Sequence, residues 1–243
     1  MGIPKKIHYC WYGGKRKPLS VRKCIQSWKK YCPDWEIIEW NEKNTNFEGL
    51  DYAKEALKAK KYSFVSDVIR LKAVYENGGI YLDTDVELIK PLDDLLELEG
   101  FFALEESEKG VYRVATGLGF GGVFGSRELL PLLWDYQNSH FIKKDGSYDL
   151  DACPLRNTNV LSNYGFENKN EIQMLGDFVV FPTEYFAPLC WWNKEITITE
   201  NTYSIHHYDS SWEPWKRRVR RKLEKVFGVG RVEKVWSMIR RFI

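Results

Sequence analysis

The sequence contains no long apolar run, and nowhere does it approach the roughly 20 apolar residues that a membrane-spanning helix needs. It also lacks any C-x-x-C pair. Its five cysteines are Cys10, Cys24, Cys32, Cys153 and Cys190. This odd, scattered set excludes a zinc site built on cysteine pairs and a disulfide framework, and it fits a reducing cytoplasm. Because the chain starts directly in a strand-like segment, we expect neither a signal sequence nor a Golgi-type membrane anchor.

Two phosphate-binding patterns are missing as well. The glycine-rich segment 116–122 has neither the lysine and serine or threonine of a P-loop nor the strand–loop–helix setting of a dinucleotide fingerprint. We therefore expect a glycine-rich sheet edge there. There is no internal repeat.

The composition is that of a soluble protein with many aromatic residues. Its 243 residues are 44% hydrophobic and 29% charged, which suits one large domain with a substantial core. Aromatic residues make up 15% of the chain and include ten tryptophans. Flat aromatic faces suit sugar rings and nucleobases, although most large aromatic side chains serve cores.

The most informative segment runs from Phe64 to Leu88. An apolar stretch with Asp67 and Arg70 three residues apart is stopped by Gly78-Gly79, and a short strand then leads to Asp83 and Asp85. Strand alternation would put Tyr81, Asp83 and Asp85 on one side. Paired carboxylates at a strand end indicate a site for Mg²⁺ or Mn²⁺, ions that commonly also hold substrate phosphates.

The alternative is that these four charged residues have only a structural role and bind no metal. Asp67 and Arg70 would then be a surface pair, and the strand would simply end in acids. Asp149-Leu150-Asp151 has the same spacing in a polar context, where we expect solvated loop acids rather than a metal site.

The order of elements predicts an α/β fold. We expect strands at 7–11, 35–40, 80–82 and 86–89, a strand-like region at 101–124, and helices at 21–31, 52–60, 64–76 and 155–163. Alternating strands and helices favour a mainly parallel sheet that binds ligands at the carboxyl ends of its strands. Trp11, Asp67 and Asp83 would then meet at one edge.

Three segments in this order carry a family resemblance. They are Ile3 to Gly14, Ser63 to Val86 and Ile205 to Trp212. Together they resemble the sugar transferases with the DXD motif, glycosyltransferase family thirty-two, of the capsular polysaccharide type, and more distantly the glucosylating clostridial toxins. The resemblance implies a GT-A-like, Rossmann-like catalytic domain, here residues 1–214, that uses Mn²⁺ or Mg²⁺ and a UDP-sugar.

The resemblance also implies roles for individual residues. Trp11 would stack on the base, unless it is a core tryptophan, and Asp67 would accept hydrogen bonds from ribose or sugar hydroxyls. Arg70 would bind sugar or phosphate oxygens and orient Asp83, which shares its face with Tyr81. Asp85 would be the direct metal ligand, and Asp83 would reach the metal through water.

The segment around residues 206–212 would complete this site. We favour His207 over His206 as a further metal ligand, because alternation lets only one of the two face inward; the other reading makes both surface histidines. Ser210 (or Ser211) and Trp212 would donate to the departing phosphate.

The resemblance also implies a retaining transfer. For its mechanism we expect same-face attack by the acceptor, since no carboxylate stands out as a nucleophile. The acceptor would be lipid-linked or an oligosaccharide, in bacterial surface polysaccharide synthesis. An acceptor wall could include Tyr185, Phe186, Trp191 and Trp192, or these could be core residues. The alternatives are a toxin-like transferase acting on protein side chains and a non-catalytic membrane adaptor.

The C-terminal segment 215–243 has a strong net positive charge, whereas the preceding residues have a net negative charge. It has eleven Lys and Arg against two Glu, whereas the preceding residues have 25 basic and 32 acidic side chains. Apolar residues recur in it at helical spacing, so we expect a basic amphipathic tail that binds the inner face of an anionic cell membrane. The alternative is a tail that packs on the core or on another subunit. The apolar stripe argues against nucleic acid as the partner.

Overall fold

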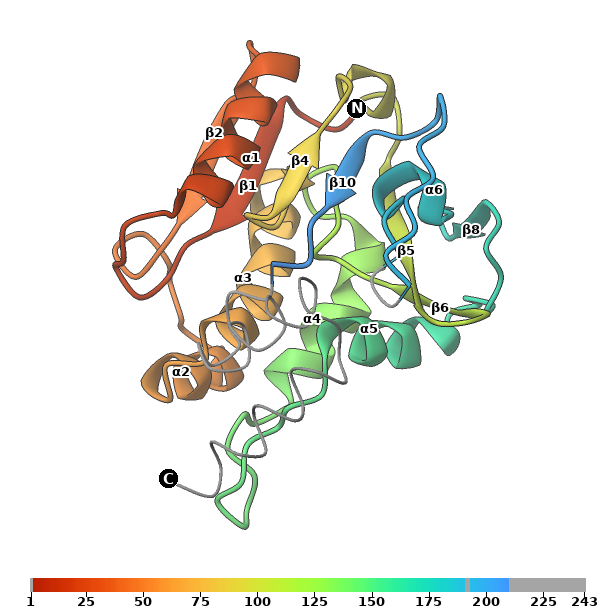
Figure 1. Cartoon of the computed structure of the whole chain (residues 1–243). Coiled ribbons are helices and arrows are strands. Elements are labelled where there is room, and N and C mark those ends of the chain that lie inside the picture. The colour runs from red at the N-terminus through yellow and green to blue at the C-terminus, as the bar shows by residue number, and fades with distance from the viewer. Residues whose placement is uncertain (1, 191–192, 210–243) are drawn as a thin grey trace, which may run out of the picture. The chain divides into compact units, whose positions relative to one another are not determined.

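A mixed eight-stranded sheet forms the centre of the computed structural model, which describes residues 2–190 and 193–209 (Figure 1). The strand order is β2 (Glu36–Trp40), β1 (Lys6–Cys10), β3 (Gly79–Tyr81), β7 (Phe120–Gly122), β5 (Gly100–Glu108), β9 (Phe178–Phe181) and β8 (Gln173–Leu175), with β6 (Val111–Val114) paired to β5. The pairings make β2, β1, β3, β5 and β9 run in one direction, and β7, β6 and β8 in the other. The predicted α/β fold with a mainly parallel sheet is confirmed.

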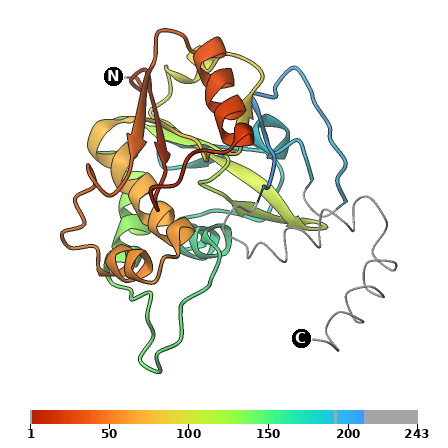
Figure 2. The ribbon, with the colours of Figure 1, turned by 60° about the vertical axis from the view of Figure 1, so that its left-hand side comes forward.

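Helices cover both faces of this sheet (Figure 2). On one face lie α2 (Asp51–Lys58), α3 (Tyr62–Asn77), α4 (Leu130–Gln137) and α5 (Cys153–Ser162), and on the other α1 (Leu19–Tyr31) and α6 (Thr183–Phe186). Two 3₁₀ turns, η1 (Asp93–Leu95) and η2 (Arg127–Leu129), complete the helices of the described part. Strand side chains alternate between the two cores: Tyr81 and Phe102 pack on the first, Ile80 and Phe101 on the second. None of the helices in this part has both the length and the apolar character needed to cross a bilayer.

Helix α3 positions the informative segment of the sequence. Val65, Val68 and Ile69 are fully buried, which fixes the face that the helix turns to the sheet. The helix ends where Gly78, with φ of 61°, donates its N–H to the carbonyl of Val74 at 2.8 Å. Glycine adopts such a positive φ without strain, and the chain turns directly into β3.

A small second sheet stands apart from the main one. Strand β4 (Val86–Leu88) pairs in antiparallel fashion with β10 (Ser204–His206), and the two lie side by side in Figure 1. Trp28 of α1 is fully buried, and its indole N–H donates to the Val86 carbonyl at 2.8 Å. The prediction of strands on both sides of the acidic pair is correct. The second of these strands, β4, belongs to the small sheet and not to the main one.

The domain boundary at residue 214 and the basic amphipathic tail 215–243 lie outside the described residues, so both stay predictions. Most of the strands and helices expected before residue 100 are present within two residues of their predicted ends.

Candidate functional site

Asp83 and Asp85 lie in a tight turn between β3 and β4. The Asp83 N–H donates to the Gly117 carbonyl and the Val86 N–H donates to the Asp83 carbonyl, each at 3.0 Å. The second bond closes the turn over residues 83–86. It is therefore this turn, rather than the expected strand alternation, that brings the two carboxylates together.

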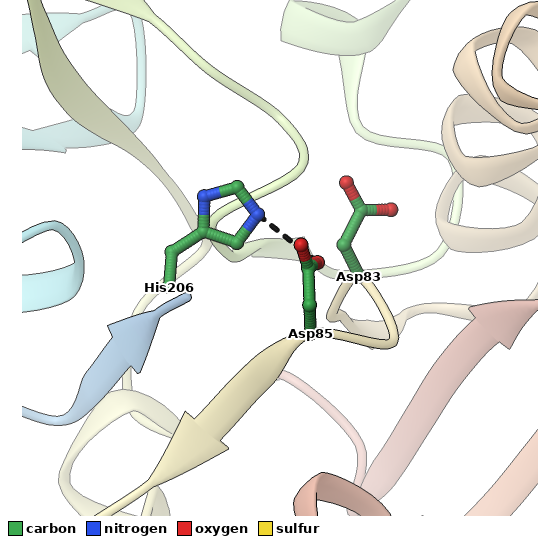
Figure 3. A group of neighbouring side chains, drawn as sticks. All are labelled: Asp83, Asp85 and His206. Carbon is green, nitrogen blue, oxygen red and sulfur yellow. Dashed lines mark hydrogen bonds and ion pairs between the residues drawn. The ribbon is translucent and has the colours of Figure 1, made fainter. Parts of the chain in front are cut away.

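His206 completes a cluster with the two aspartates (Figure 3). Its Nε2 lies 3.1 Å from Asp85 Oδ1, and the ligand atoms of Asp83, Asp85 and His206 all lie within 4.8 Å of one another. All three side chains are half-buried. Burial opposes protonation of His206, but the carboxylates of Asp85, Asp83 and Glu105 outweigh it and raise its pKa above the ordinary value.

The choice of His207 as the metal ligand is wrong in this geometry. His206 lies opposite Val86 in the β4–β10 pairing and faces inward, whereas His207 follows it and turns to the other side. The exposed His207 ring lies 2.8 Å from Glu87 Oε2, and its backbone N–H donates to the Asp85 carbonyl at 3.0 Å. The expectation that only one of the two faces inward is correct.

The three side chains fit a hard divalent cation. Two carboxylates supply the oxygen ligands that Mn²⁺ and Mg²⁺ prefer, and a neutral imidazole nitrogen can also ligate a transition metal such as Mn²⁺. His206 Nδ1 is buried and has no hydrogen-bond partner among the described residues. A ring nitrogen left in this way is open to a further interaction.

Arg70 joins two carboxylates beside this cluster. Its Nη2 lies 3.0 Å from Asp67 Oδ1 and 3.2 Å from Asp83 Oδ1, and Tyr81 donates its hydroxyl to the same Asp83 oxygen at 2.8 Å. The side chains of Arg70 and Asp67 are only 5% and 10% exposed, so the surface-pair explanation is wrong. Burial raises the pKa of Asp67 to about 6 against the opposing effect of Arg70.

The neighbouring carboxylates of this buried group repel one another, and a further positive charge would offset that repulsion. Burial also raises the pKa of Asp83, and Asp85 adds to that effect, although Arg70 opposes it. Arg70 forms ion pairs with Asp67 and Asp83, and Asp85 lies beside them against His206. A divalent ion at the cluster would relieve their mutual repulsion.

Trp11 follows β1 at the edge where Asp83 follows β3. The two strands are parallel neighbours with His8 opposite Tyr81, so Trp11 and Asp83 lie at the same edge of the sheet. Trp11 is half-buried against the second core and donates its indole N–H to the Lys15 carbonyl at 2.7 Å. Its role in stacking on a base stays a prediction.

Ser210, Ser211, Trp212, Trp191 and Trp192 fall outside the described residues.

The structure decides between the two alternatives for Phe186 and corrects the expectation for Asp149. Phe186 is fully buried and stacks on Phe101 and Tyr203, so it is a core residue and not part of an acceptor wall. Asp149 is buried rather than solvated, because Arg156 donates to it at 2.8 Å.

Sequence reasoning missed two contributors to the site. A Cβ at Gly117 would come within 2.3 Å of Asp83 Oδ2, so only glycine leaves room for that carboxylate. Glu105 of β5 is half-buried, and burial raises its pKa while His206 and Arg113 oppose this. The glycine-rich run 116–122 was the available signal for Gly117; nothing local marked Glu105.

Fold and site together define an α/β protein that gathers carboxylates and a histidine at the carboxyl edge of its sheet. Residues 18–102, which include α3, β3 and both aspartates, match the family model of the glycosyltransferase sugar-binding region containing the DXD motif. This part of the chain is therefore a DXD-containing glycosyltransferase region, as the sequence motifs indicated.

Individual relatives show how far the likeness extends. The chain is 28% identical to the glycosyltransferase L373 of Acanthamoeba polyphaga mimivirus, over 87% of this chain and 84% of that protein. It is 30% identical to inositol phosphoceramide mannosyltransferase 3 of Schizosaccharomyces pombe, over 50% of this chain and 35% of that protein. Among solved structures, the PaToxG glycosyltransferase is similar with a TM-score of 0.48 and 16% identity, over 67% of this chain and 70% of that one.

Proposed function

We propose that this glycosyltransferase takes its sugar from a nucleoside diphosphate, preferably UDP, with Mn²⁺ or Mg²⁺ held by Asp83, Asp85 and His206. The observation that carries the proposal is the convergence of their three ligand atoms within 4.8 Å, beside the buried Arg70. A divalent ion bound there supplies Lewis-acid stabilisation of the departing diphosphate, worth several kcal/mol.

The chain's own residues would orient the donor. Arg70 and the Tyr81 hydroxyl both contact Asp83 Oδ1, so this carboxylate is fixed before any ligand arrives. Asp67 offers oxygens to ribose or sugar hydroxyls, and Trp11 offers a ring face to the base. Ser210 and Trp212 would contribute donors toward the departing phosphate.

We assign the transfer to the retaining class, as the family resemblance implies. Two of the carboxylates near the site, Asp67 and Asp83, are engaged by Arg70 and therefore poorly placed to act as nucleophiles. This favours same-face attack by an acceptor hydroxyl within an ion pair over a covalent intermediate.

The proposed acceptor is a lipid-linked sugar or an oligosaccharide in bacterial surface polysaccharide synthesis. The Schizosaccharomyces pombe relative bears the name of a transferase for inositol phosphoceramide, a lipid, which supports a membrane-borne acceptor. We place the protein in the cytoplasm, peripheral on the inner face of the cell membrane, with 215–243 as the contact to anionic lipid.

The site is tested by Asp85→Asn. This change keeps the side-chain shape but removes the charge, so Mn²⁺-dependent UDP binding and donor hydrolysis should fall by at least about a hundredfold. Calorimetry with UDP and Mn²⁺ and a hydrolysis screen of nucleotide sugars measure the two quantities, and the screen also identifies the donor.

Asp151→Asn is the matched control, because Asp151 is an exposed residue of the second D-x-D pattern. It should behave as the unchanged protein. Failure of the unchanged protein to bind UDP with either Mn²⁺ or Mg²⁺ would contradict the proposed function and would favour a non-catalytic adaptor.

A further inference from the structure

A cavity of about 430 Å³ lies next to the candidate metal centre. Among the described residues it is lined by the start of α6, residues from 187–190 and 193–197, and the end of β5, and Tyr208 forms part of its wall. The Tyr208 ring also packs edge-on against His206, with ring centroids 4.1 Å apart. The Tyr208 ring therefore borders both the cavity and the candidate metal ligand His206.

The backbone of Tyr208 has an uncommon conformation. Its φ is 50°, a left-handed value that few residues other than glycine adopt. The ring is half-buried between the cavity and His206. A backbone conformation of this kind is kept only where the surrounding structure holds it, and such conformations cluster at functional sites.

The lining of the cavity is acidic and polar. Glu106, Glu184 and Glu195 contribute carboxylates, and the described lining residues include no Lys, Arg or His. Amide and hydroxyl groups supply the remaining polar atoms, from Asn170, Asn193, Thr183 and Thr197.

These carboxylates are held by neutral hydrogen bonds rather than by ion pairs. Thr199 donates its hydroxyl to Glu184 at 2.8 Å, Asn193 donates its amide to Glu195 at 2.7 Å, and the Gly110 N–H donates to Glu106 at 2.9 Å. Within the described part of the chain, no basic group forms an ion pair with any of the three. The negative charge of the cavity is therefore left without a compensating cation from these residues.

The negative charge of the cavity disfavours a nucleoside diphosphate and favours a neutral or amino sugar. A nucleoside diphosphate would meet like charges here, so the donor's phosphates belong on the metal side of Tyr208. Carboxylates and amides together suit hydroxyl groups, which donate to the former and both donate to and accept from the latter. A neutral sugar fits such a lining, and an amino sugar adds a favourable charge.

We propose that this cavity binds the acceptor sugar and selects neutral or amino sugars over anionic ones. The inference rests on the proposed glycosyltransferase function. It also means that the phosphates of a lipid-linked acceptor lie outside the cavity, while the terminal sugar enters it. Tyr208 then marks the border at which an acceptor sugar in the cavity meets the donor bound at the proposed cation site.

A matched set of sugars tests this charge selection on the full chain. Glucose, glucosamine and glucuronate are titrated into the protein saturated with UDP and Mn²⁺, and binding is measured by calorimetry. Glucose and glucosamine should bind at least tenfold more tightly than glucuronate. In Glu184→Gln/Glu195→Gln the discrimination should shrink to less than threefold, since two of the three charges are removed.

The control is Glu200→Gln, an exposed glutamate of the same region that does not line the cavity. It should keep the full discrimination, and all variants should keep UDP binding and thermal stability. Equal binding of the three sugars, no sugar binding, or unchanged discrimination in the double variant would overturn the inference while leaving UDP binding intact. Loss of UDP binding in the unchanged protein would instead overturn the proposed function itself.

Discussion

At the scale of single residues, Arg70 organises the site. Its guanidinium contacts Asp67 and Asp83 from a buried position, so removing it would leave carboxylates without their partner in a poorly solvated place. Breaking a buried ion pair in this way typically costs about 3–5 kcal/mol. An Arg70 variant would therefore report on folding as much as on substrate binding, and sharper tests lie at its neighbours.

The two adjacent histidines provide such a test. His206→Ala should weaken Mn²⁺ binding at least about tenfold, because it removes one of the three ligands of the cluster. His207→Ala should leave it unchanged, since that ring faces Glu87. Mn²⁺ titration monitored by electron paramagnetic resonance measures both. Equal loss in the two variants would contradict the assignment of His206.

Gly117 provides a second residue-scale prediction. In Gly117→Ala the new methyl group would lie 2.3 Å from Asp83 Oδ2 and 3.1 Å from Arg70 Nη1, so the carboxylate must move. Displacing a catalytic group by about 1 Å costs up to about a hundredfold in rate. Donor hydrolysis should fall accordingly.

The control for Gly117 is Gly110→Ala, where a Cβ meets nothing within 4 Å but φ is +75°. That variant should lose some stability through backbone strain and keep its hydrolysis rate. Full activity of Gly117→Ala would show that the Asp83 position is not critical.

At the scale of elements, the site is assembled from two sheets. Strand β3 of the main sheet delivers Asp83, and the small β4–β10 sheet delivers Asp85 and His206. The bond from the His207 N–H to the Asp85 carbonyl joins the end of β10 to the turn. The backbone of residue 207 is thus important even though its side chain points elsewhere.

His207→Pro tests this backbone role directly. Proline has no N–H, so the bond to the Asp85 carbonyl is lost while the His206 side chain stays in the sequence. We expect Mn²⁺ affinity to fall about tenfold or more, as for the loss of other groups that orient a ligand. The same titration on His207→Ala, which keeps the N–H, is the comparison. Equal Mn²⁺ affinities in the two variants would count against a role for the hydrogen bond from the His207 N–H to the Asp85 carbonyl.

At the scale of the whole molecule, charge is distributed unevenly along the chain. The segment 215–243 has eleven basic residues against two acidic ones, while the acceptor cavity of the catalytic part is lined by carboxylates. A basic amphipathic segment binds anionic lipid with a strength that falls as salt rises. This division would assign the contact with the membrane and the binding of the acceptor sugar to different parts of the chain.

Deleting residues 215–243 tests this division of roles. Binding to vesicles that contain phosphatidylserine should be lost, because each basic residue near an anionic surface contributes about 1 kcal/mol. UDP and Mn²⁺ binding should persist. Co-sedimentation with phosphatidylserine vesicles, and with neutral phosphatidylcholine vesicles as the control, measures the effect. Unchanged sedimentation of the shortened protein would rule the tail out as the anchor.

The sequence alone determined the features that depend on near neighbours. Several features lie within short stretches of sequence, where the residues nearest in the chain decide the backbone conformation. They are helix α3 with its end at Gly78, strands β1 and β3, and the acidic pair. The same proximity made Asp67, Arg70, Asp83 and Asp85 visible as one group. The motifs also sufficed to recognise a DXD glycosyltransferase.

Only the tertiary structure decided the features that join distant segments. Strand β10 has three residues and meets β4 across more than 110 positions, so no local pattern announces it. Its register decides between His206 and His207, because a shift of one residue turns every side chain to the opposite face. The structure likewise showed that Asp67 and Arg70 form a buried ion pair at the site and not a surface pair. The sequence could not decide this, since the solvent exposure of a side chain depends on how the whole molecule packs.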